Sequence, residues 1–156
     1  MAGANSPRDS VLENSVERLV LQQELASLIS QYSFTWDGKD APAFAELFTE
    51  DCVYEIWRSG GAKATRELKG RAVVRDFAVE SFSIRLADRQ TRHYQTNTVF
   101  IDVTDTVVQA RTMVVVLHAH ATDKSLKVAF TGTYEDEFRR TLVGWRISKR
   151  IIRLDT

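Results

Sequence analysis

The sequence has few of the residues that build disulfide-rich or metal-binding scaffolds. Its 156 residues include one cysteine, Cys52, two prolines and three histidines. One cysteine excludes an intrachain disulfide and a cysteine-rich metal site, and Cys52 is expected to be a small buried residue. The apolar runs are too short to span a bilayer, and the first residues, MAGANSPRDS, lack the apolar core of a signal peptide. We therefore expect a cytoplasmic protein.

Excess charge of either sign is also absent. The chain has 21 basic and 21 acidic residues and a formal net charge of zero. Nucleic-acid-binding proteins usually carry a basic excess, and a neutral chain has no electrostatic attraction to membranes. Walker and Rossmann glycine patterns, HExxH and the nucleophile elbow are missing. His118 and His120 share a strand face but have no third ligand nearby. We expect no nucleic acid, membrane, metal or cofactor as a partner.

The composition is that of a globular protein, with 44% hydrophobic and 27% charged residues. We expect a disordered or extended lead-in over 1–15 and a single domain over 16–156. Apolar residues at three- and four-residue spacing predict a first helix over 15–36, ended by Gly38. These residues are Leu21, Leu25, Leu28, Ile29, Tyr32 and Trp36.

Two further helices and a pair of strands are expected before residue 90. Asp40 is placed to cap a short helix whose apolar residues are Phe44, Leu47 and Phe48. Strands are expected over 52–57 and 65–69, and a third helix over about 71–86. The core candidates of that third helix are Val73, Val74, Phe77 and Phe82.

The second half of the chain contains four long β-rich runs, over 92–103, 107–121, 125–140 and 145–154. Short polar turns separate them, so neighbouring strands are antiparallel. Helices followed by a strand meander are an α+β pattern. A strongly bent sheet wrapped around the helices leaves a pocket between them.

Side-chain alternation predicts which residues face that pocket. With the first long turn centred on Asp105, His93 lies opposite Leu117 and Asn97 opposite Met113. This face mixes apolar and polar residues, which is typical of a small-molecule cavity. The alternative is a core face with polar residues at its open end, and a register shift of one residue would invert every face.

The opposite face of the same strands is expected to be an apolar outer surface. In this register it carries Thr112, Val114, Val116 and His118. An open sheet with an apolar outer face favours self-association. We therefore expect a homo-oligomer, a dimer or a trimer.

Several segments together resemble a known superfamily. They are Tyr32 to Asp37, Phe48 to Tyr54, Arg92-His93 with Asn97, and Gly132 to Phe138 with the tail Gly144 to Arg150. Over 16–154 the chain resembles the SnoaL-like branch of the NTF2-like superfamily. That resemblance implies an α+β, cone-shaped barrel with N-terminal helices packed on a strongly curved, mainly antiparallel sheet. The superfamily includes dehydratases, dehydrohalogenases, isomerases, polyketide cyclases and non-catalytic binding modules.

The resemblance also implies a catalytic pair. Bile-acid 7α-dehydratases, scytalone dehydratase and hexachlorocyclohexane dehydrochlorinase eliminate without a cofactor, using a histidine base supported by an aspartate. The corresponding residues here are His93 and Asp37, with Tyr32 five residues before the aspartate. Arg150 corresponds to an arginine late in the last strand of the dehydrochlorinase. A two-residue turn would place Arg150 on the outer face, whereas a longer turn or a bulge would turn it inward.

Chemistry supports these roles but leaves structural alternatives open. A histidine base titrates near ambient pH, and an aspartate that accepts its second N–H fixes the tautomer. The structural alternative for His93 is a strand-end residue without a catalytic role. The alternative for Asp37 is a helix-end residue whose carboxylate bonds the backbone of its own turn. Tyr32 either assists a leaving hydroxyl or fills the core.

Further residues are candidates for substrate contacts. Tyr54 has the same hydroxyl chemistry as Tyr32, and Asn97 shares the expected face of His93. Seven residues are wall or core candidates, two roles that sequence does not separate: Trp36, Phe77, Met113, Val115, Leu117, Phe130 and Tyr134.

The resulting hypothesis is a cofactor-free lyase or isomerase that acts on a small, hydrophobic, oxygenated ring. Dehydration is the first choice, with cyclisation and double-bond isomerisation close behind. The alternative is a non-catalytic ligand-binding or assembly module, such as the small subunit of a ring-hydroxylating oxygenase.

Overall fold

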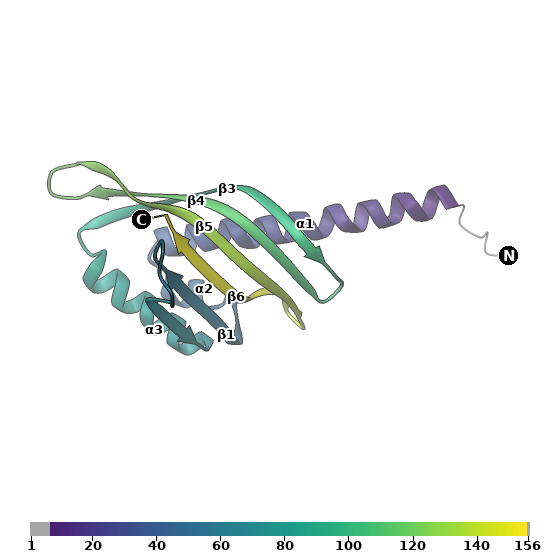
Figure 1. Ribbon diagram of the computed structural model, residues 1–156, viewed down its shortest axis with the longest axis horizontal. Coiled ribbons are helices and arrows are strands. Elements are labelled where there is room, and N and C mark those ends of the chain that lie inside the picture. Colours follow the sequence, from purple (N-terminus) through teal and green to yellow (C-terminus); the bar gives the residue numbers. More distant parts are fainter. Residues whose placement is uncertain (1–6, 156) are drawn as a thin grey trace.

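The computed structural model describes residues 7–155, which form helices on a six-stranded curved sheet (Figure 1). The helices are α1 (Pro7–Asp37), α2 (Ala41–Ala45) and α3 (Arg71–Glu80), followed by a π-helical turn, η1 (Ser81–Arg85). The strands are β1 (Phe48–Trp57), β2 (Arg66–Lys69), β3 (Arg89–Val103), β4 (Val107–His120), β5 (Leu126–Thr141) and β6 (Gly144–Leu154). None of the described helices is long and apolar enough to cross a membrane.

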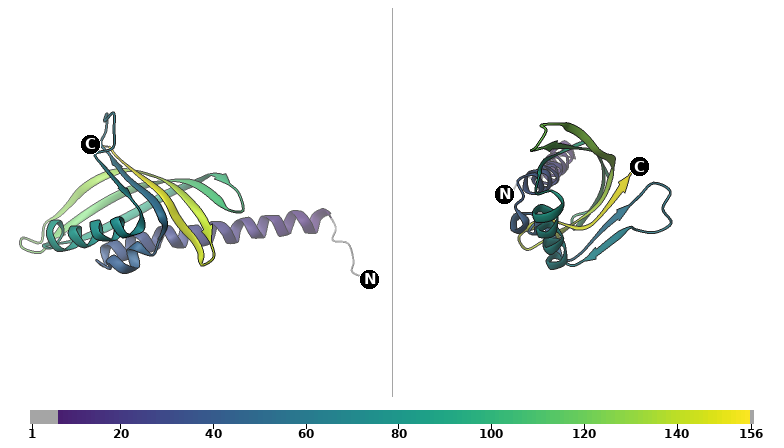
Figure 2. Two further views of the ribbon diagram at one scale, coloured as in Figure 1. Left: turned by 90° about the horizontal axis from the view of Figure 1, so that it is seen from below. Right: turned by 90° about the vertical axis from the view of Figure 1, so that its left-hand side faces the viewer.

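The sheet order is β2-β1-β6-β5-β4-β3. Every neighbouring pair is antiparallel except β1 and β6, which run parallel. Seen from one end, the sheet curls around the helices (Figure 2). This is the expected α+β architecture, and the curl places the inner sheet face opposite the C-terminal half of α1.

Helix α1 buries the predicted face. Leu25, Leu28, Ile29, Tyr32 and Trp36 are all buried, because the 3.6-residue period keeps them on one side. The helix begins at Pro7 rather than Ser15, and its N-terminal half extends beyond the sheet (Figure 1). The described part of the expected lead-in is therefore helical, and residues 1–6 lie outside the described residues.

The next two helices follow the prediction with two corrections. The Asp40 carboxylate accepts a hydrogen bond from the Ala43 backbone N–H at 3.0 Å, which caps α2. In α3, Val74 and Phe77 are buried, but Val73 is 46% exposed. The expected third helix is not uniformly α-helical, because its last turn widens into η1, where the Leu86 N–H bonds the Ser81 carbonyl at 2.8 Å.

The register between β3 and β4 differs from the prediction by one residue at the site. His93 pairs with Val116 and Thr96 with Met113, rather than His93 with Leu117. The predicted register holds only where Val99 pairs with Arg111 and Phe100 with Ala110. An extra residue in β3 at Asn97 (φ 54°) produces the shift, since a bulge opposes two residues to one.

The shift inverts the predicted faces of β4. Val114 and Val116 are 2% and 1% exposed and face the core, whereas Met113 and Val115 are 56% and 39% exposed. The expectation that Thr112, Val114, Val116 and His118 form the outer surface is therefore wrong. The outer face is instead formed by exposed apolar residues of three strands: Tyr94, Val99, Ile101, Met113, Val115 and Val128.

Candidate active site

A cavity of about 220 Å³ lies between α1, α3 with η1, and the inner face of the sheet. Its walls are mainly aromatic: Tyr32, Trp36, Tyr54, Phe77, Phe130 and Tyr134 all line it. These six sequence candidates are therefore brought together, and His93 lines the cavity with them. A larger groove of about 790 Å³ between α1 and the β3–β4 turn contains neither histidine nor tyrosine.

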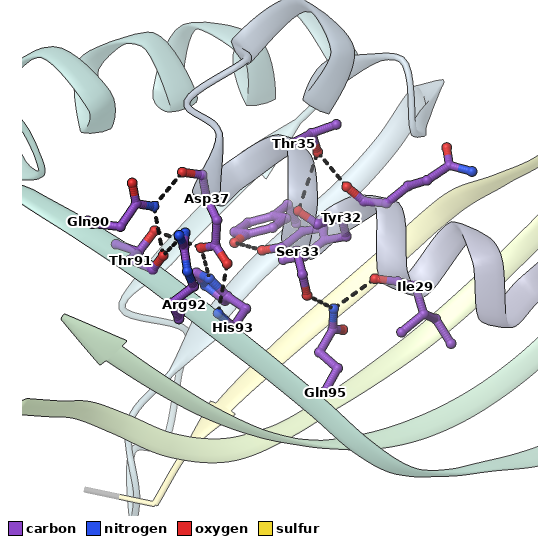
Figure 3. A network of polar contacts seen from close by, with 12 residues as sticks. Ile29, Tyr32, Ser33, Thr35, Asp37, Gln90, Thr91, Arg92, His93 and Gln95 are labelled. Atoms are coloured by element: carbon purple, nitrogen blue, oxygen red, sulfur yellow. Dashed lines mark hydrogen bonds and ion pairs between the residues drawn. The ribbon is translucent and has the colours of Figure 1, made fainter. Parts of the chain in front are cut away.

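His93, which lines this cavity, forms a close pair with Asp37 (Figure 3). The His93 ring nitrogen Nδ1 lies 2.6 Å from Asp37 Oδ1, and the two side chains are 5% and 10% exposed. Asp37 Oδ2 accepts the His93 backbone N–H at 2.9 Å, and the Thr91 hydroxyl donates to Oδ1 at 2.7 Å. The last residue of α1 is thus fixed to the start of β3.

Two glutamines extend this connection between α1 and β3 (Figure 3). The Gln90 side-chain amide donates to the Asp37 carbonyl at 2.7 Å. The Gln95 amide donates to the Ile29 carbonyl at 2.8 Å and to the Ser33 hydroxyl at 2.7 Å. These bonds limit the movement of the helix end against the strand, so the orientation of the pair is set before any ligand binds.

The electrostatics of Asp37 keep it ionised. Burial alone would raise its pKa, but the hydrogen bond and charge interaction with His93, together with the Thr91 hydroxyl, lower the pKa below its usual value. A carboxylate is an acceptor only, so the His93 Nδ1 carries a hydrogen toward it. In a neutral imidazole with this tautomer, Nε2 is the nitrogen that can accept a proton.

Three tyrosines lie beside the pair. The Tyr32 and Tyr54 hydroxyls are 2.9 Å apart, and the Tyr32 ring stands edge-on to His93 with ring centroids 6.2 Å apart. The buried Tyr134 hydroxyl has no partner of hydrogen-bonding geometry among the described residues. Burial raises the pKa of all three. Each is therefore a neutral hydroxyl that can donate a hydrogen bond.

Arg150 points inward, as the bulge alternative requires. The pairing of β5 and β6 shifts between Glu137 and Phe138, so Ser148 is an extra residue and the following side chains change face. Arg150 is fully buried, and its guanidinium donates two hydrogen bonds to Asp136 at 2.7 and 2.8 Å. Burial would lower its pKa, but Asp136 outweighs this and raises it.

The Arg150 charge reaches the cavity through aromatic rings rather than directly. Its guanidinium carbon lies 3.9 Å from the ring centroid of Tyr32 and 4.5 Å from that of Tyr134. Arg150 itself does not line the cavity. A permanent cation behind two phenol rings favours negative charge developing on their hydroxyl side.

Among the cavity-lining residues that sequence reasoning missed, two have ionisable side chains, His118 and Arg85. His118 lines the cavity on β4, where burial and nearby Arg89 lower its pKa, so it is neutral near pH 7. The one-residue register error had placed it outside. Arg85 also lines the cavity, and no sequence signal marked the π-helical turn that carries it.

Besides Arg150 and Val115, three residues predicted to contact the substrate do not line the cavity. Asn97 is exposed at the bulge, where its amide nitrogen lies 3.4 Å from the Met113 sulfur. Met113 is 56% exposed on the outer face. Leu117 pairs with Arg92 and is only half-buried. Their predicted placement at the substrate was wrong, because the Asn97 bulge turns these side chains to the other face of the sheet.

Other reactive groups offer little chemistry. Among the side chains of residues 11–155, no three His, Cys, Asp or Glu are grouped to hold a metal ion. Cys52 is buried as expected, and burial raises the pKa of its thiol to about 11. It is therefore a neutral thiol near pH 7 and a poor nucleophile. The chemistry of the cavity rests on imidazole, carboxylate and phenol groups.

Comparison with solved structures shows close likeness in fold. An NTF2-like protein with a cystatin-like fold from Novosphingobium aromaticivorans is 25% identical, with a TM-score of 0.77 over 97% of this chain and 92% of that one. A candidate scytalone dehydratase from the same organism is 20% identical, with a TM-score of 0.76 over 91% and 89%. The beta subunit of a candidate aromatic-ring-hydroxylating dioxygenase, also from that organism, is 22% identical, with a TM-score of 0.77 over 89% and 92%.

Sequence comparison assigns the family. A search of curated proteins gave no match. A family model described as SnoaL-like domain matches residues 17–151, which is most of the chain. With its helices on a curved, mainly antiparallel sheet, the chain belongs to the SnoaL-like domain family of the NTF2-like superfamily.

Proposed function

We propose that this protein is a cofactor-independent lyase, in the first instance a dehydratase, that acts on a small hydrophobic ring bearing oxygen. The observation that carries the proposal is the 2.6 Å contact between His93 Nδ1 and Asp37 Oδ1 at the wall of an aromatic cavity. A buried histidine oriented by a carboxylate is an arrangement suited to proton abstraction.

In the proposed reaction, His93 Nε2 takes a proton from a carbon next to the carbon that bears the hydroxyl. The electrons of the C–H bond form the new C=C bond, and the C–O bond breaks. The departing hydroxyl takes a proton from the Tyr32 hydroxyl and leaves as water. The imidazolium then returns its proton to the Tyr32 oxygen, which restores both groups. Asp37 stabilises the imidazolium while it exists.

The surroundings suit a leaving hydroxyl. Tyr32 and Tyr54 form a hydroxyl pair at 2.9 Å, and the Arg150 guanidinium lies 3.9 Å from the Tyr32 ring centroid. The cation lowers the energetic cost of partial negative charge on the Tyr32 oxygen as it gives up its proton. A histidine base alone would serve isomerisation as well as dehydration. The tyrosine hydroxyls beside it can protonate a leaving hydroxyl group, and their presence therefore favours dehydration.

The test is a screen of hydroxylated cyclic ketones for loss of water, followed by mass spectrometry and by absorbance of the conjugated product. His93→Ala and Asp37→Asn are expected to lower kcat/KM by about 10²–10⁴-fold, the usual contribution of a positioned general base. The matched control is His120→Ala, because His120 does not line the cavity. Unchanged turnover in His93→Ala would refute the mechanism.

A second candidate is a non-catalytic module, such as the small subunit of a ring-hydroxylating oxygenase. The observation that favours it is the similarity of fold to a dioxygenase beta subunit, with a TM-score of 0.77. In this case Asp37→Asn changes stability or ligand binding without altering any reaction rate. Co-purification with a larger iron-containing subunit, together with no turnover in the screen, would select this candidate.

A further inference from the structure

The mouth of the cavity carries a cation without an acidic partner. Arg85 is the last residue of η1 and lines the cavity with Phe77 and Ser81. Its Nη2 donates a short hydrogen bond to the Ser81 hydroxyl, and its guanidinium carbon lies 4.7 Å from the Phe77 ring centroid. No carboxylate within 11–155 forms an ion pair with Arg85.

Arg66 brings a second guanidinium to the same ring. Its guanidinium carbon lies 5.2 Å from the Phe77 centroid, and it too lacks an ion pair with any described carboxylate. Most other arginines of the sheet and helices have one, including Arg71, Arg139 and Arg153. Two unpaired guanidinium groups beside one cavity-lining ring make this rim locally positive.

Hydrogen bonds before and after Arg85 hold its side chain and the π-helical turn in place. The Ser81 hydroxyl donates to the Phe77 carbonyl at 2.6 Å, and Ser81 is 2% exposed, so the acceptor for Arg85 is fixed. From the end of α1, the Lys39 ammonium donates to the Leu86 carbonyl at 2.6 Å, which anchors the chain just after η1. Single-turn π-helical segments of this kind occur frequently at functional sites.

The charge of the lining points to the kind of group that binds there. The fifteen residues that line the cavity include one arginine and two histidines but no aspartate or glutamate. The Asp37 charge is engaged by His93 and Thr91, and the Arg150 charge is matched by Asp136. Arg85 lines the cavity, Arg66 lies beside its Phe77 wall, and neither has an ion pair with a described carboxylate. A guanidinium presents paired N–H donors that fit a planar carboxylate.

We propose that the substrate of this site is a cyclic carboxylic acid whose carboxylate binds Arg85, assisted by Arg66, while its ring lies in the aromatic cavity toward His93. This proposal rests on the proposed function and defines its substrate class. A cavity of about 220 Å³ is below the usual size of ligand sites, roughly 300–1,000 Å³, so the ring system is small.

The test is binding, measured apart from turnover, of 1-naphthoate and 1-naphthamide, which share a ring and differ in charge. By isothermal titration calorimetry, the wild-type protein is expected to bind the acid about tenfold more tightly than the amide, as one charge-assisted contact implies. Arg85→Leu is expected to remove this preference and Arg85→Lys to retain part of it. Arg66→Leu reduces the preference by a smaller factor.

The matched control is Arg75→Leu, which removes an arginine of α3 that pairs with Asp76 and does not line the cavity. It is expected to keep the full preference, and circular dichroism checks that each variant is folded. Equal binding of acid and amide, a preference that persists in Arg85→Leu, or no binding of either compound would overturn the proposal.

The same variants separate this inference from the proposed function. In His93→Ala the acid preference is expected to persist while turnover is lost. If acid and amide bind equally but turnover still depends on His93, only the substrate class is wrong. If the acid preference depends on Arg85 but no elimination occurs, the cavity binds carboxylic acids without the proposed reaction.

Discussion

Asp37 joins the end of α1 to the start of β3 through both its backbone carbonyl and its side chain. Its two carboxylate oxygens accept from the His93 ring, the His93 N–H and the Thr91 hydroxyl. An asparagine of the same size can accept with only one side-chain oxygen and carries no charge. Asp37→Asn therefore keeps the volume of the side chain and removes the charge that sets the tautomer of His93.

The pH dependence of stability tests this residue directly. The pKa of Asp37 is lowered in the folded state, relative to an unfolded value of about 3.9. Its ionised form therefore contributes stability that is fully present above that unfolded value and is lost as the pH falls through the folded pKa. We expect Asp37→Asn to cost about 1–2 kcal/mol at pH 7, in the range of a charge-assisted hydrogen bond.

The measurement is urea unfolding of wild type and variant from pH 7 down to pH 3. The difference in free energy of unfolding is expected to shrink as the pH falls below about 4, because protonation removes the same charge in the wild type. Asp76→Asn is the control, since Asp76 is an exposed residue of α3 whose ion pair is with Arg75. A difference that stays constant across this range would contradict the assignment.

Among the elements, β3 depends on a single residue in the left-handed region. Asn97 has φ 54° and forms the bulge that turns the side chains of the strand. Asparagine tolerates this conformation, whereas a β-branched residue does not. We expect Asn97→Val to lower the free energy of unfolding by about 1–2 kcal/mol, and Asn97→Gly to leave it nearly unchanged.

Chemical denaturation and the elimination assay measure both effects. Because Asn97 lies on the outer face, neither variant is expected to change kcat/KM at a temperature where the protein is folded. A specific loss of activity in the well-folded Asn97→Gly variant would indicate that the Asn97 side chain contacts the substrate.

The bulges also explain where sequence reasoning succeeded and failed. The buried face of α1 followed from spacing alone, because a helix has one period and tolerates a few residues of error in its ends. The buried faces of β3 and β4 could not be derived from spacing alone, because one inserted residue moves every following side chain to the opposite face of the sheet. Neither Asn97 nor Ser148 is marked by a nearby glycine or proline, so His118 was placed outside and the orientation of Arg150 stayed open.

The catalytic candidates were less sensitive to this error. His93 and Asp37 were identified from a motif, and their contact depends on the start of β3, before the bulge. Tyr32, Trp36 and Phe77 lie on helices, where the pattern was sufficient. Arg85 was beyond sequence reasoning, because a π-helical turn has no pattern distinct from the α-helix that precedes it.

At the scale of the whole molecule, the exposed apolar outer face of β3, β4 and β5 favours self-association. We expect a homo-oligomer formed through this face, as a contiguous apolar patch implies. Met113→Lys and Val115→Lys each place a charge in the patch and are expected to shift the molar mass measured by light scattering toward that of the 17.7 kDa chain.

Val79→Lys is the matched control, since Val79 is a valine 50% exposed on α3, away from the sheet. It is expected to leave the molar mass unchanged. If Met113→Lys and Val115→Lys associate as the wild type does, the interface lies elsewhere, and the N-terminal half of α1, which exposes Leu12, Val16 and Leu19, becomes the next surface to test.

The bond from the His93 backbone N–H to Asp37 Oδ2, at 2.9 Å, gives the contact between these two residues an internal reporter. Strand amides normally bond to a neighbouring strand, but this one bonds to the last residue of a helix. Its hydrogen exchanges with solvent only when α1 and β3 separate. The exchange rate of one amide therefore reports the separation of His93 from Asp37 in the resting protein, before any substrate has been identified.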